Sequence, residues 1–538
     1  MCDFQHGLFI LQEIQKQTYM QLNKENIQVR ANTIECGHDT GSDVFAGFVL
    51  KKKLSSESDL GFSLKALNYG CAEKNEVAYI PFIENLKLNT SKTVVHVSLN
   101  HKAVLTTFMR GVFQSNALAE ETKPNSKKKD MTLLCHVGGA LNNITNRRIF
   151  LTAFVYKRML QKDYNCNIYS TSGDGCTLVS DAIQQTIDNI VAVNAETSND
   201  VCDSVNLKII EKLKQCIYTN QAQGKRICFD ARMCIATLHS NRGTYLQEID
   251  TIEVVDKNGE PTETLSYAAR MKPATELKSD LTLHLTPYKQ LYRLQCSSLL
   301  LQHSTTQTVK QVFCCCGGDT SAESHNIHTL LSARKKELWQ SYKMKYGRKV
   351  TVFCFSLGEK WNETIQCVAV ASLKLDLYLT SFNSKLKIGE DNKIVSRDSL
   401  FILYNYARLC NVKFTFDEKV KQGFYPPLPS PAEIDFTLLT EEAEWNITLR
   451  YLLTFENLLK DVRVTMTTSK DATVHVMPKY LSDLSRDMSS YYHQTKILLD
   501  PRPHLFPLMF ARLSFAMALK QVMKETFDLL GIDPPEQM

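Results

Sequence analysis

The sequence predicts an α/β body followed by an all-α helical bundle, and two observations support this prediction. In the middle of the chain, the short apolar run Thr132–Val137 and the β-rich run Asn167–Thr171 flank a helical pattern over Arg147–Leu160. Strand, helix and strand in this order are typical of a parallel crossover unit. From about Thr364 onward, apolar residues recur at three- and four-residue spacing, the period of one helix face.

Composition limits the class of protein. The 538 residues carry 43% hydrophobic and 22% charged side chains, and the net charge of +6 permits a polyanionic partner without requiring one. Seventeen cysteines, an odd number with no C-x-x-C pair, argue against a disulfide scaffold and against a zinc ribbon. We therefore expect reduced thiols, no bound metal and a cytoplasmic protein, with the nucleus as the alternative. Neither a signal peptide nor a membrane span is expected.

The predicted domain boundaries follow changes in composition. Residues 1–125 mix helical spacing with β-rich runs such as Val94–Leu99, and their fold is left open. The polar stretch Glu121–Asp130 contains a proline and three consecutive lysines, which predicts a linker. We expect the α/β body to span residues 126–350 and the helical domain to span residues 364–538.

Several helices are predicted after the body. The spacing favours a basic helix over Arg334–Tyr346, a helix over Arg397–Val412 and one continuous helix over Glu441–Val462. A further helix should begin near Pro478, because proline fits the first turn. The last helix follows Pro503 and should end at Gly531, since a glycine readily terminates a helix.

Four sequence blocks in the C-terminal part give the chain a family resemblance. Together they resemble the DALR anticodon-binding domain that closes arginyl-tRNA synthetases. The resemblance implies a folded tRNA as ligand. It also implies that the α/β part is a degenerate class I synthetase-like, Rossmann-like body. The blocks are SLKLDLYLTS (372–381), LFILYNYARLC (400–410, with Tyr404, Ala407 and Arg408 in the family's Tyr-x-x-Ala-Arg pattern), YLSDLSRDMSSYYHQTKIL (480–498) and LLGIDPPEQM (529–538).

Both catalytic motifs of class I synthetases depart from the family pattern. The segment His136–Gly139 keeps the first histidine and Gly138 of the His-x-Gly-His turn, but Gly139 replaces the second histidine. The segment Lys343–Tyr346 resembles the Lys-Met-Ser-Lys loop without its serine and its last lysine. We therefore regard His136, Gly138 and Lys343 as motif remnants, and we expect a pseudo-synthetase with no catalytic residues and no cofactor.

Further blocks resemble a narrower, non-catalytic branch of the family. That resemblance implies an adaptor that recognises arginine tRNAs and presents them to a methyltransferase, which forms 3-methylcytidine in the anticodon loop. Two alternatives remain open, namely an active or vestigial arginyl-tRNA synthetase and a structural subunit of a synthetase complex. The blocks are EIDFTLL (433–439), WNITLRYLLTFENLL (445–459) and ILLDPRPHLFPLMF (497–510).

Candidate tRNA-binding residues follow from what an anticodon loop offers. Unstacked bases are recognised by aromatic or arginine stacking and by hydrogen bonds, while phosphates are contacted by basic side chains. On the helix from Arg397, a stripe combines these residue types, although Arg408 could instead pair with Glu444 inside the bundle. The candidates are Arg397, Phe401, Tyr404, Asn405 and Arg408 on this helix, Arg502 and Arg512 around the last helix, and Lys343 and Lys345 in the basic helix.

Overall fold

The computed structural model describes most residues of the chain. Most of the predicted linker, residues 121–127, lies outside them. The described residues are 7, 9–14, 17, 48–49, 60–63, 82–88, 94–114, 128–137, 143–172, 175–179, 199–221, 225–237, 245–246, 248–275, 279–304, 309–316, 326–350, 357–381, 384, 386–389, 394, 398–468 and 472–538.

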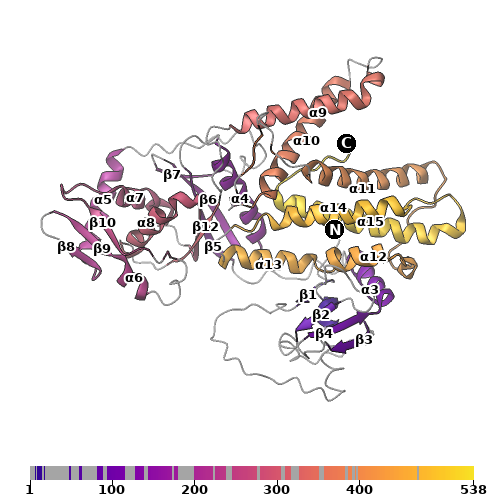
Figure 1. Cartoon of the computed structure of the whole chain (residues 1–538), viewed down its shortest axis with the longest axis horizontal. Helices are drawn as coiled ribbons and strands as arrows, with labels where there is room; N and C mark the ends of the chain where they lie inside the picture. The colour runs from indigo at the N-terminus through magenta and orange to yellow at the C-terminus, as the bar shows by residue number, and fades with distance from the viewer. Residues whose placement is uncertain are drawn as a thin grey trace.

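A five-stranded, mainly parallel sheet forms the centre of the molecule (Figure 1). Its strand order is β12-β11-β5-β6-β7, and only the last pair is antiparallel. The parallel pairing of β5 with β6 across helix α4 confirms the predicted crossover unit. The strands are β5 (Lys129–His136), β6 (Tyr164–Ser172), β7 (Gly175–Leu178), β11 (Leu281–Thr286) and β12 (Lys310–Cys315).

The two faces of this sheet belong to different cores, because successive side chains of a strand point to opposite faces. On β12, Val312 and Cys314 join the core shared with α4 (Ile144–Leu160), whereas Phe313 and Cys315 join a second core. Helix α4 begins at the N-cap Asn143, whose side chain accepts a hydrogen bond from the backbone N–H of Thr145. It is buried on several sides, since it lies between the sheet and the helical bundle.

The second core belongs to an inserted module, which is formed by the chain between β7 and β11 and by the chain between β11 and β12. A small antiparallel sheet, in the order β10-β9-β8, and several helices enclose this core at one end of the molecule (Figure 1). The elements are α5 (Asn199–Lys214), β8 (Thr219–Gln221), β9 (Ile227–Asp230), α6 (Ala231–Thr237), β10 (Thr251–Val255), α7 (Glu263–Thr275), a 3-10 turn (Tyr288–Gln290) and α8 (Leu291–Ser304).

The described part of the N-terminal region contains an antiparallel sheet in the order β1-β2-β4-β3 and a helix. The predicted strand Val94–Leu99 is confirmed as β4. The His101 ring stacks on Trp445 of the helical region at 3.9 Å between centroids, so this region packs on the bundle. Its other elements are β1 (Phe48–Val49), β2 (Leu60–Ser63), β3 (Ile83–Leu88) and α3 (His101–Gln114).

The C-terminal part is all-helical in its described residues, as predicted. The predicted helix over Arg397–Val412 is confirmed, but α11 continues to Lys421. The proline-rich stretch 425–431 is a loop. The helices are α9 (Ile327–Val350), α10 (Leu357–Leu379), α11 (Asp398–Lys421), α12 (Glu442–Ile447), α13 (Phe455–Thr468), α14 (Val476–Gln494) and α15 (Phe506–Leu530), with 3-10 turns at Phe436–Leu438 and Pro503–Leu505.

The prediction of one continuous helix over Glu441–Val462 is wrong. A π-helical turn at Thr448–Leu452 separates α12 from α13, and the backbone N–H of Leu453 donates to the carbonyl of Thr448 at 2.9 Å. Such a turn inserts one extra residue into the helical repeat. The inserted residue changes the rotational phase of the helix, so Trp445 and Phe455 are both buried in the same core.

The end of α15 confirms the predicted helix stop. Gly531 adopts a left-handed backbone with φ +66°, which favours glycine, and the Ile532 N–H returns to the carbonyl of Phe527 at 2.9 Å. Helix α10 holds this turn, because the ammonium of Lys374 donates to the Gly531 carbonyl at 2.9 Å and the Tyr378 hydroxyl donates to Leu530 at 3.2 Å. The terminal segment is therefore an integral part of the bundle.

By length and composition alone, the stretch Pro503–Leu530 is apolar enough to cross a membrane. Half of its most apolar window is buried within the protein, where α15 contacts α4, α11 and α14. Its apolar character is accounted for by its place in the centre of the bundle.

Candidate nucleic-acid interface

Helix α11 places two of the predicted residues together at the surface. Tyr404 is 44% exposed, and Arg408 lies one turn further along the same side of the helix. The Arg408 guanidinium is 5.5 Å from the ring centroid of Tyr404 and 4.0 Å from that of Tyr492, which belongs to α14. Both distances fall within the range of about 6 Å for cation–π contacts. We call Tyr404, Arg408 and Tyr492 the aromatic–arginine stack.

The hydrogen-bond donors of Arg408 are not used within the described part of the chain, where it has no ion-pair or hydrogen-bond partner. The alternative that Arg408 pairs with Glu444 is wrong, because Arg512 occupies that carboxylate with Nε 3.2 Å from Oε1. A planar guanidinium that rests on aromatic rings and keeps its donors can stack on a base or bind a phosphate.

An apolar pocket of about 340 Å³ adjoins the stack. Tyr404 belongs to both features, so a ligand in the pocket would touch the stack. The pocket volume lies within the range of about 300–1,000 Å³ typical of ligand sites. In Figure 1 the C-terminal end of the chain lies between α9 and α11, in agreement with Met538 among the lining residues. The pocket is lined by Leu338, Ser341, Tyr342, Leu400, Phe401, Tyr404 and Met538.

Arg512 has a structural role, in contrast to its prediction as an RNA contact. Its side chain is 10% exposed and is held by the carboxylates of Glu441 and Glu444 and by the carbonyl of Lys496. Burial raises the pKa of the Glu444 carboxyl, an effect that the Tyr491 hydroxyl and the Arg512 guanidinium partly offset. Because these carboxylates neutralise its charge inside the bundle, Arg512 is not available to bind a phosphate.

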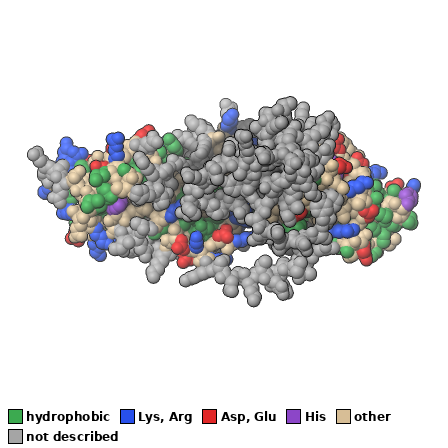
Figure 2. Space-filling view, turned by 90° about the horizontal axis from the view of Figure 1, so that it is seen from below, with side chains coloured by type: hydrophobic (Ala, Val, Ile, Leu, Met, Phe, Trp, Pro, Cys, Tyr) green, Lys and Arg blue, Asp and Glu red, His purple; other side chains and the backbone are tan. Residues whose placement is uncertain are grey.

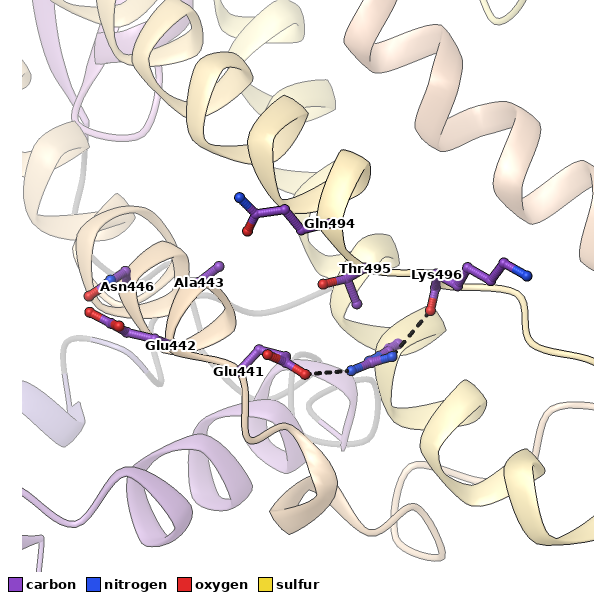
Figure 3. Close-up of a pocket in the computed structure, with 8 residues that line it drawn as sticks. Glu441, Glu442, Ala443, Asn446, Gln494, Thr495 and Lys496 are labelled. Carbon is purple, nitrogen blue, oxygen red and sulfur yellow. Dashed lines mark hydrogen bonds and ion pairs between the residues drawn. The ribbon is translucent and has the colours of Figure 1, made fainter.

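A polar pocket of about 390 Å³ lies beside Arg512. Figure 3 shows the Glu441 carboxylate and the Lys496 carbonyl directed at the guanidinium between them. Carboxylates at its mouth disfavour a phosphate ligand. The pocket is lined by Glu441, Glu442, Ala443, Asn446, Gln494, Thr495, Lys496 and Arg512.

Asn405 is also misplaced in the predicted stripe. Its side chain is fully buried, and its amide donates to the carbonyl of Phe401 at 2.9 Å, one turn back in α11. The stripe prediction failed here because Asn405 directly follows the exposed Tyr404 and lies about 100° around the helix from it, on the buried side. Asn405 therefore cannot contact a base.

The remaining candidates lie apart from the stack. Arg397 lies outside the described residues. Arg502 is exposed in the turn before α15, and Lys343 is exposed on α9. Lys345 is in α9, but its side chain lies outside the described residues. On the face shown in Figure 2, basic and acidic side chains are interspersed at both ends.

The motif remnant His136 is enclosed in a buried polar cluster. It ends β5, and its imidazole lies 2.7 Å from the Tyr267 hydroxyl, 2.9 Å from the Thr171 hydroxyl and 3.0 Å from the ring of His284. Burial lowers the pKa of both imidazoles, that of His284 to about 3. His136 is therefore a neutral core residue that cannot meet ATP phosphates from this position. Gly138 lies outside the described residues.

This cluster predicts a stability that falls on acidification. The folded protein keeps His136 and His284 neutral, whereas the unfolded chain protonates them below about pH 6.5. The unfolded state then binds more protons, so we expect the free energy of unfolding to fall by up to about 2.7 kcal/mol per pH unit below that value. Urea unfolding at several pH values would measure the slope. His284→Phe should reduce the slope, and an unchanged slope would contradict the assignment.

The second remnant lies in a regular helix. The expected Lys-Met-Ser-Lys counterpart, Lys343–Tyr346, is part of α9, which is helical over Ile327–Val350. The resemblance implied a loop whose lysine reaches a nucleotide. A residue inside a 24-residue helix is held by hydrogen bonds on both sides, so Lys343 does not occupy such a loop.

Sequence reasoning did not assign six residues of the stack and the pocket: Tyr492, Leu338, Ser341, Tyr342, Leu400 and Met538. The adjacent pair Tyr491 and Tyr492 gave no signal, because both rings pack against the core and Tyr492 differs only in being half-buried. Tyr342 and Met538 could not be found from local spacing, because α9 and the terminal segment meet only through the folding of the bundle.

Comparison with known proteins agrees with the fold described above. The sequence profile described as "DALR anticodon binding domain" matches residues 402–538. The structure of Thermus thermophilus arginyl-tRNA synthetase has a TM-score of 0.58 at 13% identity over 90% of this chain and 95% of that chain, which shows a shared fold. The chain thus has an arginyl-tRNA-synthetase-like fold that ends in a DALR anticodon-binding domain.

Two relatives that share one name are similar to the chain over half or more of its length. The zebrafish protein (Danio rerio) named DALR anticodon-binding domain-containing protein 3 is 28% identical over 289 residues, 51% of each chain. The mouse protein (Mus musculus) of the same name is 27% identical over 356 residues, 60% of this chain and 64% of that protein. The chain is a relative of these proteins, and the matches span between half and two thirds of their length.

Proposed function

We propose that the chain binds tRNA through its DALR domain, with the anticodon loop on the aromatic–arginine stack and an unstacked base in the apolar pocket. The observation that carries the proposal is Arg408, which rests on the rings of Tyr404 and Tyr492 while its donors remain available. Stacking on bases is tolerant of sequence, whereas a guanidinium also distinguishes base edges and binds phosphates. The name of the matching domain family supports the same ligand.

Loss of the Arg408 guanidinium should weaken tRNA binding. A lost charge-assisted contact costs about 1.5–3 kcal/mol, which corresponds to roughly a tenfold to hundredfold loss of affinity. We expect this loss in Arg408→Ala for arginine tRNAs, measured by mobility shift at fixed salt. Arg232→Ala, an exposed arginine of the inserted module, is the control with the same change of charge. If Arg408→Ala melts normally and binds as the parent does, the interface lies elsewhere.

We further propose that the chain acts as a non-catalytic adaptor. It would select arginine tRNAs and present them to a methyltransferase that forms 3-methylcytidine in the anticodon loop. Support comes from the sequence resemblance and from the two altered motifs. The test is methylation of arginine and non-arginine tRNAs by the methyltransferase with and without the chain. Equal methylation in all four reactions would exclude the adaptor role, and Arg408→Ala should reduce any stimulation.

An arginyl-tRNA synthetase reaction is not expected. The single imidazole of the first motif is buried, and Gly139 stands where the second histidine belongs. The lysine of the second motif is held within a helix. Neither motif therefore places a preorganised group where charge moves to pyrophosphate in the transition state. We predict no arginine-dependent exchange of labelled pyrophosphate into ATP. Detectable exchange above a no-arginine control would favour the synthetase alternative instead.

A further inference from the structure

Helix α9 presents an exposed basic and aromatic face whose role is not explained by packing. Lys336, Trp339 and Lys343 follow one another at three- and four-residue spacing, which places them on one side of the helix. Both lysines are exposed, and the indole of Trp339 is 43% exposed. A tryptophan left this accessible is a large apolar surface in water.

The other side of α9 is firmly anchored, so this face has a fixed orientation. Leu331 and Leu338 are buried, and Arg334 forms a buried ion pair with Asp376 of α10, with 2.5 Å between Nη2 and Oδ2. The helix therefore cannot roll to hide its indole. Figure 1 shows α9 at the edge of the helical part of the molecule, next to α10.

Charge identifies a polyanion as the partner. Helix α9 contains seven lysine or arginine residues and a single glutamate, Glu337. The carboxylate of Glu337 lies 3.9 Å from Arg334, on the anchored side. Lys336 and Lys343 are seven residues apart, about 10 Å along the axis, so they would reach separate phosphates rather than one. This spacing suits an extended sugar–phosphate backbone.

The position of this face of α9 beside the apolar pocket indicates that the polyanion is an RNA. Leu338, Ser341 and Tyr342 of α9 form one wall of that pocket, and Phe401 and Tyr404 of α11 form the other wall. The exposed face of α9 is thus adjacent in sequence to residues that line the pocket. An RNA whose loop occupies the pocket would contact α9, so the nucleotides that flank the loop would lie near this helix.

We infer that the exposed face of α9 is a second RNA-binding surface, with Lys336 and Lys343 on the phosphates of the stem and Trp339 stacked on an unpaired base beside it. The inference rests on the proposed function, since it concerns the same RNA. Basic side chains that follow the backbone, together with an aromatic ring for a base, are the usual means of binding exposed RNA strands.

The test compares two RNAs on the full chain: a hairpin with the anticodon arm of an arginine tRNA, and its loop as a single strand. Lys336→Ala/Lys343→Ala should bind the hairpin about tenfold more weakly and lower the dependence of log Kd on log salt by about 1.5, for two lost phosphate contacts. The same variant should bind the single strand as the parent does. Trp339→Ala should weaken hairpin binding by about fivefold to a hundredfold.

Matched controls come from the inserted module. Lys212→Ala/Lys214→Ala removes two exposed lysines of α5, and Tyr288→Ala removes a ring that is 72% exposed. If the α9 variants bind the hairpin no differently from these controls, the inference is overturned while the proposed function stands. An equal loss for both RNAs would also overturn the assignment to the stem. If the parent chain binds neither RNA, the proposed function itself fails.

Discussion

Replacing Asp376 with alanine should destabilise the protein by about 3–5 kcal/mol, because it removes the buried counter-ion of Arg334 and leaves this buried guanidinium only the partly exposed Glu337, 3.9 Å away. The Asp376 side chain is fully buried and the Arg334 side chain is 5% exposed. Breaking such a pair exceeds the cost of an average substitution several-fold. Urea unfolding followed by circular dichroism would measure the loss. A destabilisation below about 1 kcal/mol would mean that water reaches the pair.

Two control variants distinguish the effect of burial on the ion pair from the effect of an unpaired charge. Glu253→Ala breaks the ion pair with Arg226, whose side chains are about 40% exposed, and should change stability by less than about 1 kcal/mol. Arg334→Met/Asp376→Leu removes both buried charges and should recover most of the stability lost in Asp376→Ala. A double variant as unstable as Asp376→Ala would show that packing, not the unpaired charge, causes the loss.

The same pair connects stability with the interface. Arg334 is one turn before Leu338 in α9, and Leu338 lines the apolar pocket opposite α11. An α9 helix that loosens on α10 would therefore displace one wall of the pocket as well as the basic face. We expect Asp376→Ala to weaken RNA binding even where the protein remains folded.

The fold was largely predictable because the decisive signals are local. The apolar run of β5, the β-rich run of β6, the helical spacing of α4 and the glycine that ends α15 each depend on a few neighbouring residues. The π-helical turn at Thr448–Leu452 was not predictable in this way. Trp445 before the turn and Phe455 after it are both buried in the core, and the apolar spacing of the segment does not indicate where the helical repeat changes.

The candidate site was predictable only in part, for a physical reason. Tyr404 is exposed and Arg408 is half-buried on the same side of one helix, so helical spacing was enough to group them. For the other candidates, burial and pairing with residues of other helices determine whether the side chain is available to a ligand. Arg512 is neutralised by Glu444 from a distant segment, and Asn405 turns toward the core. Spacing along one helix carries no information about which neighbour covers it.

Deletion of the chain from Pro503 onward should abolish the cooperative unfolding of the helical domain. Helix α15 buries nine large apolar side chains, and each contributes about 1.5–3 kcal/mol on burial. Their combined contribution reaches or exceeds the total stability of about 5–15 kcal/mol expected for a domain. The residues are Met509, Phe510, Leu513, Phe515, Leu519, Val522, Met523, Phe527 and Leu530.

Polar groups add to this loss, because the deletion also removes Arg512 from Glu444 and the Gly531 carbonyl from Lys374. Calorimetry of the truncated and full chains gives the comparison. Met538→Ala is the control: it removes one pocket side chain without touching α15, so it should melt like the parent while binding RNA more weakly. A truncated chain that still shows a cooperative helical-domain transition would refute the view that α15 completes the core.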